Sequence, residues 1–492
     1  MKVGYAKITV GDACYLYDTT TNAIVSVTPA VHAVLEDYLR LGSRAVLRKY
    51  AGQLPAEELG HAVEFLRACR GRGMLQPMRL LNYLPSTNAT RLRRLYAQGL
   101  SRMTLMITEQ CNQRCRYCQF GGAGRGARRS GTMDWGTARQ SIDYLLSHAA
   151  GRRAPTLELF GGEPVLSWPV IRQAILYLRQ HLRRPDVEIV LYTNATLLDR
   201  AKLELLVVNK VVLQVSLDGP AQVHDRDRVL ADGRGTHSDV LRVLNRIRRR
   251  DPVYYRKYLR LRCTFSLESD LLEVFQYFSR AMFRDLRISF GYRVSPFRIP
   301  KAVRIRHERQ LDELVGRYLR AMRERRPFHR ALFARIVGSG FGALELRRVG
   351  KAGRWPMPNS VCVPGQTKLF VSGDGTFSPC EHYNQTGSTI GCCRRGIDFR
   401  KAEKLLQDYA RLCSRMCQGC WAWRLCAHCF IHSTDKDGCL SRICKEKNCR
   451  FEKEDIVKAL HRYVSILRNE PARASKMKHT LRYSVRHQEI EP

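Results

Sequence analysis

The chain has 492 residues, of which 44% are hydrophobic, so we expect two or three domains rather than a single core. No apolar run approaches the roughly 20 residues that a bilayer requires, and the opening segment lacks the apolar stretch of a secretory signal. These features predict a cytoplasmic protein with no membrane partner. The formal charge of +39 attracts polyanions and leaves nucleic acid open as a partner, although lysine and arginine occur in almost every segment.

Cysteine is abundant and unevenly distributed. Of the 18 cysteines, 12 lie between Cys362 and Cys449, and three form a tight group at Cys111, Cys115 and Cys118. The cytoplasm keeps thiols reduced, so metal ligation is the expected role of these groups. The others are expected to be buried thiols: Cys14, Cys69 and Cys263.

Residues 1–75 predict a small α+β unit. The alternating runs CYLYD and AIVSV flank the turn-rich TTTN and indicate a hairpin. Helical periodicity follows, with Pro29 and Pro55 near the expected helix starts. Residues 76–102 are expected to be a linker.

Residues 103–300 predict an α/β domain. Short β-rich runs alternate with helical stretches, which implies a parallel sheet in an open, partial-barrel or full-barrel form. Catalytic groups should then lie in the loops after the strands. The runs are MTLMI, LELF, VEIVLYT, VVLQVSL, LRLRCTF and LRISF. A basic, helical connecting segment is expected at 301–352.

The string CNQRCRYC follows the first of these strands. Its three thiolates can bind three irons of a four-iron cluster and leave the fourth iron open, whereas electron-transfer clusters have four protein ligands. A zinc site is the alternative, but this loop lacks a nearby fourth ligand. With Tyr117 before the third cysteine, the string resembles the radical S-adenosylmethionine (radical SAM) superfamily.

This resemblance implies a partial (β/α)6 barrel that holds a [4Fe-4S] cluster on Cys111, Cys115 and Cys118 and binds S-adenosyl-L-methionine. It implies that the adenine packs near Tyr117, that the GGEP segment binds the methionine amino group, and that TNAT and VSLDGP line the ribose and carboxylate. The implied cofactor-binding residues are Tyr117, Gly161, Gly162, Glu163, Pro164, Asn194, Ser216 and Asp218. From the residues alone, the last three also suit caps or turns.

The spacing Cys362-x12-Gly375-x4-Cys380 is followed by Cys417-x2-Cys420-x5-Cys426-x2-Cys429. With this pattern, residues 353–452 resemble a SPASM domain, the auxiliary-cluster extension of peptide-modifying radical enzymes. The last cysteine interval has two residues here, where the family has three. One implied cluster uses Cys362, Cys380 and Cys429, and the other uses Cys417, Cys420, Cys426 and Cys449, with Cys444 and Cys439 as alternatives to Cys449. A zinc ribbon is the competing interpretation. Glu381, next to Cys380, is a hypothetical catalytic base, and a solvated glutamate is its alternative.

Together these features resemble radical peptide maturases, which implies a ribosomal precursor peptide as substrate, cysteine thioether crosslinking as the reaction and an external electron donor. The N-terminal unit resembles a winged-helix-like module that captures a leader peptide at a sheet edge. The alternatives are an anaerobic sulfatase-maturating enzyme, an RNA-modifying radical enzyme and a non-catalytic iron–sulfur scaffold. Residues 453–492 are expected to form a C-terminal helix and a basic tail.

Overall fold

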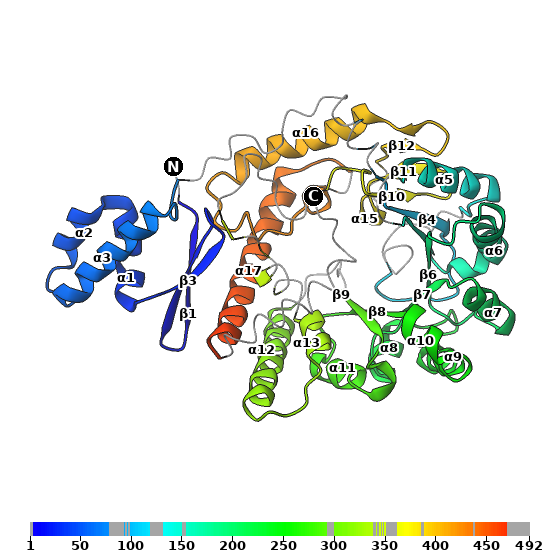
Figure 1. Ribbon diagram of the computed structural model, residues 1–492, viewed down its shortest axis with the longest axis horizontal. Helices are drawn as coiled ribbons and strands as arrows, with labels where there is room; N and C mark the ends of the chain where they lie inside the picture. Colours follow the sequence, from blue (N-terminus) through cyan, green and yellow to red (C-terminus); the bar gives the residue numbers. More distant parts are fainter. Residues whose placement is uncertain are drawn as a thin grey trace. The chain divides into compact units, whose positions relative to one another are not determined.

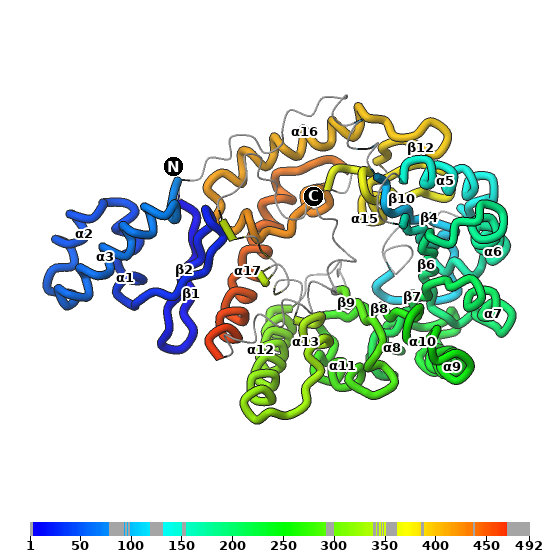
Figure 2. The backbone as a smooth tube through the Cα atoms, viewed as in Figure 1, coloured from blue at the N-terminus to red at the C-terminus, as the bar shows by residue number. Residues whose placement is uncertain are grey.

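The computed structural model describes residues 3–77, 93, 96, 99–118, 131–149, 154–292, 300–337, 341, 344–345, 347, 349–350, 362–384, 388–435 and 438–469. The chain divides into two compact units (Figures 1 and 2). The first contains residues 1–87, 338–362 and 404–492, and the second contains 88–337 and 363–403. Among the described residues, no helix is both long enough and apolar enough to cross a membrane.

The second unit is built on a parallel sheet. Six strands lie side by side in chain order: β4 (Arg102–Thr108), β5 (Thr156–Gly161), β6 (Glu188–Thr193), β7 (Val212–Ser216), β8 (Leu259–Phe265) and β9 (Arg287–Tyr292). All five neighbouring pairs are parallel. The six β-rich runs of the sequence are therefore confirmed as the strands of an α/β fold.

Helices connect these strands and lie along the outer side of the curved sheet (Figure 1). They are α5 (Trp135–His148), α6 (Trp168–Leu176), α7 (Arg200–Val208), α8 (Ala221–Asp227), α9 (His237–Arg250), α10 (Pro252–Tyr258) and α11 (Leu271–Phe278). Side chains cap several of them: Asp134 accepts from Thr137 N at 2.7 Å and begins α5, and Asp199 does the same for α7 at 2.8 Å from Lys202 N. Within the described residues 300–337, the connecting segment forms α12 (Lys301–Arg323) and α13 (Arg330–Ile336).

Part of the cysteine-rich region extends the same sheet. Strand β10 (Lys368–Val371) pairs in parallel with β4, and β11 (Thr376–Ser378), β12 (Gly391–Cys392) and β13 (Gly396–Ile397) follow antiparallel. A short helix, α15 (Glu381–Asn384), begins directly after Cys380. Cys380 and Glu381 are thereby fixed to the edge of the parallel sheet.

The first unit begins with a three-stranded antiparallel sheet, β1 (Tyr5–Val10), β2 (Ala13–Asp18) and β3 (Ala23–Val27), in that order. The expected hairpin is confirmed, since β2 pairs with β3. The buried Asp18 closes it by accepting from Thr21 N at 2.8 Å and from Leu75 N at 3.0 Å.

Three helices follow and form a core with the sheet: α1 (Pro29–Leu41), α2 (Ser43–Tyr50) and α3 (Ala56–Gly71). The fully buried residues of this core include Leu16, Val34, Leu35, Val46 and Leu66. The same unit holds the later part of α16 (Phe399–Met416) and the long helix α17 (Arg442–Asn469). Arg468 on α17 pairs with Asp12 at 2.6 Å and ties this helix to the β1–β2 turn.

Candidate cofactor and cluster sites

The first cysteine group lies in the loop that leaves the carboxyl end of β4. Cys118 N donates to Cys115 O at 3.1 Å, Gln113 N to Cys111 Sγ at 3.3 Å, and the Cys115 thiol to Gln113 Oε1 at 3.3 Å. Burial raises the pKa of Cys115 to about 12, against the opposing effect of Arg228. A bound metal deprotonates a coordinating thiol outright, so this donor set suits a metal cluster better than a free thiolate.

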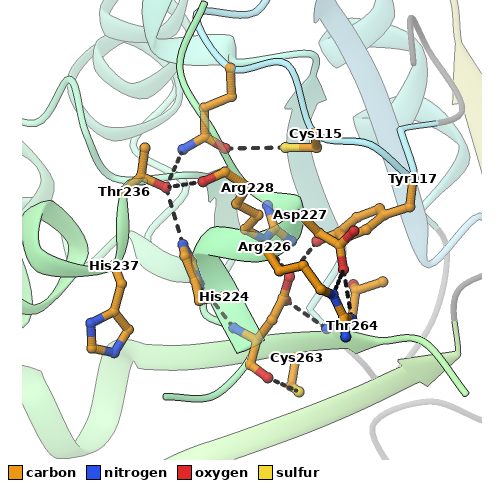
Figure 3. A network of polar contacts seen from close by, with 12 residues as sticks. Cys115, Tyr117, His224, Arg226, Asp227, Arg228, Thr236, His237, Cys263 and Thr264 are labelled. Atoms are coloured by element: carbon orange, nitrogen blue, oxygen red, sulfur yellow. Dashed lines mark hydrogen bonds and ion pairs between the residues drawn. The ribbon is translucent and has the colours of Figure 1, made fainter. Parts of the chain in front are cut away.

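The segment before α9 holds this loop in place. Arg114 N donates to Val229 O at 2.7 Å, and Arg116 N donates to Asp227 O at 2.9 Å. The Gln113 amide reaches Thr236 Oγ1 at 3.0 Å, and His224 Nε2 lies 3.1 Å from the same hydroxyl (Figure 3). Hydrogen bonds from Gln113, Arg114 and Arg116 therefore fix the cysteine loop to the segment before α9.

A buried polar network connects Tyr117 to the ends of β7 and β8. Asp218 Oδ2 accepts from Tyr117 Oη at 2.5 Å and from Arg228 Nε at 2.7 Å, and Oδ1 accepts from Thr264 N at 2.8 Å. Arg228 also lies 5.3 Å from the centroid of the Tyr117 ring (Figure 3). Both carboxylate oxygens of Asp218 thus bind protein groups, and its side chain positions Tyr117.

The two glycines of the GGEP segment permit a close approach of backbones. A Cβ on Gly161 would lie 2.3 Å from Thr108 O, and one on Gly162 would lie 2.3 Å from Gln110 O. Gly162 N donates to Thr108 O at 2.8 Å, and Glu163 N donates to Gln110 O at 2.7 Å. The end of β5 therefore packs against the chain just before Cys111.

Glu163 is buried between the ends of β5 and β6. Its carboxylate accepts from Thr193 Oγ1 at 2.8 Å, Asn194 N at 2.7 Å and Val165 N at 3.2 Å. Burial raises its pKa to about 7 despite these three hydrogen bonds, which lower it. Pro164 follows at the first position of the 3-10 helix Pro164–Ser167.

Asn194 joins the TNAT segment to the cysteine loop. Its side-chain amide donates to Asn112 Oδ1 at 2.8 Å and lies 4.0 Å from Cys111 Sγ. Ser216 is half-buried at the last position of β7, next to Leu217 and Asp218. The structure therefore gathers the sequence-predicted residues of the first site at the carboxyl ends of β4 to β7, as the parallel fold requires.

The second cysteine group lies mainly in the first unit. Cys417 and Cys420 follow α16, and Cys417 N donates to Cys413 O at 2.7 Å. Burial raises the pKa of Cys426 to about 12, and the nearby Cys449 adds to this. The predicted ligands Cys417, Cys420, Cys426 and Cys449 share this unit, whereas Cys439 is exposed.

The other predicted auxiliary ligands occupy both units. Cys380 lies in the sheet-containing unit, and Cys362 and Cys429 lie in the first unit. A cluster bound by these three remains a prediction. Beside Cys380, Glu381 Oε2 lies 2.6 Å from Lys368 Nζ. Burial raises the pKa of Glu381, but the ammonium lowers it more, to about 2.

Sequence patterns did not predict several residues of these sites. Arg228 and Thr264 complete the Asp218 network, and no spacing rule connects them to the cysteine motif. Lys445 is different: it lies four residues before Cys449 on α17, so both occupy one helix face. Among the described His, Cys, Asp and Glu side chains, no group of three could hold a single metal ion.

A parallel α/β sheet with three thiols in the loop after its first core strand defines a class of cluster-binding enzyme. Residues 105–256 match the family model described as Radical SAM superfamily. A cysteine-type anaerobic sulfatase-maturating enzyme of Clostridium perfringens is 24% identical over 391 residues, covering 74% of this chain and 93% of that enzyme. These matches assign residues 105–256 to the radical SAM superfamily.

Two further comparisons find similar proteins, one by sequence and one by fold. An uncharacterized protein of Methanocaldococcus jannaschii is 26% identical over 144 residues, which is 29% of this chain and about half (47%) of that protein. A solved structure of anSMEcpe with bound AdoMet has a TM-score of 0.57 at 18% identity, covering 77% of this chain and 98% of the other. The second comparison concerns the fold alone.

Proposed function

We propose that the chain modifies a ribosomally synthesised peptide, by cysteine thioether crosslinking, with a [4Fe-4S] cluster and S-adenosyl-L-methionine bound in the second unit. The observation that carries the proposal is the convergence of the cysteine loop, the GGEP segment and Asn194 at the carboxyl ends of β4 to β6. When bound, the reduced cluster supplies the electron that cleaves S-adenosylmethionine into methionine and a 5′-deoxyadenosyl radical.

Each group at this edge has a role in that proposal. Cys111, Cys115 and Cys118 hold the cluster. Gly161 and Gly162, which pack closely against Thr108 and Gln110, place the GGEP backbone beside the methionine moiety. Tyr117, oriented by Asp218, packs beside the adenine, while Asn194 and Ser216 line the ribose and carboxylate. The curved strands β4 to β9 act as a partial (β/α)6 barrel, which shields the radical from water and places a substrate C–H bond against it.

The N-terminal sheet supports a peptide as the substrate. Strand β3 pairs with β2 on one side, and on its other side residues 23–27 make no backbone hydrogen bond to any described residue. Such an edge can accept an extended peptide as an additional strand. We propose that β3 captures the leader of the precursor, in the manner of a winged-helix-like recognition module.

The two auxiliary clusters complete the proposal. Joining a thiol to a carbon radical releases one electron, which a nearby oxidised cluster can accept before passing it to an external carrier. Cys417, Cys420, Cys426 and Cys449 would bind one cluster, and Cys362, Cys380 and Cys429 the other. Glu381 would take the proton that leaves with that electron.

Formylglycine formation is the second candidate, because the C. perfringens relative is named as a sulfatase-maturating enzyme and is covered over 93% of its length. A solved structure of anSMEcpe holds both AdoMet and a peptide and has a TM-score of 0.55 at 20% identity, covering 75% of this chain and 99% of that one. Both candidates use a peptide cysteine, but they differ in the product.

Mass spectrometry of the peptide separates them. We would co-express the chain anaerobically with a short cysteine-containing reading frame encoded beside it, with Cys115→Ala enzyme as the matched control. A loss of two hydrogens per modified cysteine is expected for crosslinking. Conversion of thiol to aldehyde would establish formylglycine formation instead, and an unmodified peptide despite 5′-deoxyadenosine release would exclude this peptide as the substrate.

A further inference from the structure

Lys445 is a lysine in an unusual environment. It lies on α17 in the first unit, and only 1% of its surface is exposed. Lysine is almost never fully buried unless an anionic partner accompanies it. The groups around its ammonium are therefore informative.

Those groups include sulfur atoms, the Tyr409 ring and the His428 imidazole. The Lys445 side chain hydrogen-bonds Cys413 and interacts electrostatically with Cys417 and Cys449. Its Nζ atom lies 5.0 Å from the centroid of the Tyr409 ring. Within the described part of the chain, no carboxylate forms an ion pair with it.

Neutral thiols and a ring do not compensate a buried ammonium, whose desolvation costs several kcal/mol. Thiolates bound to iron would compensate it, because a [4Fe-4S] cluster with four cysteine ligands carries net negative charge. The buried cation and two of the cysteines near it, Cys417 and Cys449, fit such a cluster, whose proposed ligands do not include the hydrogen-bonded Cys413. A second polar group lies near the same cysteines. His428 Nδ1 lies 3.7 Å from Cys449 Sγ, and Glu452 Oε2 lies 3.8 Å from His428 Nε2.

We propose that Lys445 raises the reduction potential of an auxiliary cluster bound by Cys417, Cys420, Cys426 and Cys449. Charge and hydrogen bonds near the sulfurs are the means by which proteins set this potential. Reduction adds one electron and makes the cluster more negative, so a nearby ammonium stabilises the reduced form. This inference rests on the proposed function and deepens it, because a higher potential makes the cluster a better acceptor for the electron that crosslinking releases.

The test is a redox titration monitored by electron paramagnetic resonance. It uses a full-length variant of the protein that keeps only this cluster. Alanine replaces Cys111, Cys115, Cys118, Cys362 and Cys380 in that variant. Lys445→Met removes the charge while keeping the length of the side chain, and Lys445→Gln keeps a hydrogen-bond donor. Lys445→Arg keeps the charge, and Lys447→Met on the exposed face of α17 is the matched control.

We expect both neutral variants to lower the equilibrium constant for one-electron reduction at least tenfold, a shift of about 59 mV to more negative potential. Lys445→Arg should stay closer to the parent, and Lys447→Met should match it. A parent-like potential in Lys445→Gln or Lys445→Met would overturn the inference. Iron and sulfide analysis of the parent tests the proposed function separately, since a parent without any cluster would contradict the auxiliary site itself.

Discussion

The Nε atom of Arg228 lies 2.7 Å from Oδ2 of Asp218, and both side chains are buried. The same carboxylate oxygen accepts from Tyr117, one residue before Cys118. This ion pair therefore connects the segment before α9 to the cysteine loop. It also explains how the Tyr117 side chain is oriented beside the cysteine loop.

Replacing Arg228 with methionine should be strongly destabilising, because it leaves the Asp218 carboxylate buried without its cation. Loss of one partner of a buried pair costs about 3–5 kcal/mol. Anaerobic urea unfolding measures this cost, and a parallel titration with S-adenosylmethionine should show weaker binding as Tyr117 loses its orientation. Arg234→Met is the control, since Arg234 is exposed and its partner Asp239 keeps a second cation, Arg242; this ion pair is expected to contribute at most about 1 kcal/mol.

Gly162→Ala should displace the backbone of the first site, because the added methyl group would collide with a neighbouring carbonyl oxygen. The new Cβ would lie 2.3 Å from Gln110 O, so the chain before Cys111 must move. We expect a loss of S-adenosylmethionine cleavage of at least tenfold, measured as 5′-deoxyadenosine release. Gly60→Ala, on helix α3 with no atom within 4 Å of its Cβ position, should cleave normally and gain about 0.5–1 kcal/mol of stability. Normal cleavage by Gly162→Ala would show that the close approach is not required.

The sequence predicted the parallel fold, and it predicted where most residues of the proposed first site gather, because both depend on local patterns. Alternating β-rich and helical runs predict βα units, and strand ends predict where Cys111, Gly162 and Asn194 gather. The sequence could not predict that the Asp218 carboxylate accepts hydrogen bonds from Arg228 and Thr264, because these contacts form only when distant segments pack. For the same reason, nothing in the cysteine pattern predicted that β10 would pair with β4.

The raised pKa of Glu163 predicts that the free energy of unfolding depends on pH. Its folded-state pKa, about 7, lies above the value of about 4.3 for an unfolded glutamate. The folded protein thus binds this proton more tightly, and the resulting stability is complete below about pH 4 and is lost as pH rises to 7. The loss is about 4 kcal/mol, because the two pKa values differ by about 2.7 units and each unit corresponds to about 1.36 kcal/mol.

Urea unfolding of the wild type and of Glu163→Gln across pH 4.5–7 measures this contribution. The glutamine variant has a constant penalty, because its amide faces the Asn194 N–H, but it lacks the titration. The stability difference between the two proteins should therefore change with pH in this window. Parallel curves for the two proteins would contradict the raised pKa.

Glu381→Gln tests the proposed base. The Lys368 ammonium at 2.6 Å keeps the carboxylate charged and fixed beside Cys380. The variant should release 5′-deoxyadenosine at a normal rate but form at least tenfold less modified peptide, because hydrogen abstraction precedes proton loss. Glu268→Gln, at an exposed position, is the control. Full peptide modification by Glu381→Gln would leave Glu381 only the role of an ion-pair partner.

The edge of β3 that pairs with no described strand predicts a pattern of hydrogen exchange in the full-length protein. A bound leader peptide should slow exchange of outward-facing amides in Ala23–Val27, since they gain backbone hydrogen bonds. Strand β2 provides an internal control, because it is already paired on both sides, with β1 and with β3. A peptide with the same composition in scrambled order should leave β3 unprotected. Protection that appears elsewhere while β3 exchanges unchanged would place leader capture outside this sheet.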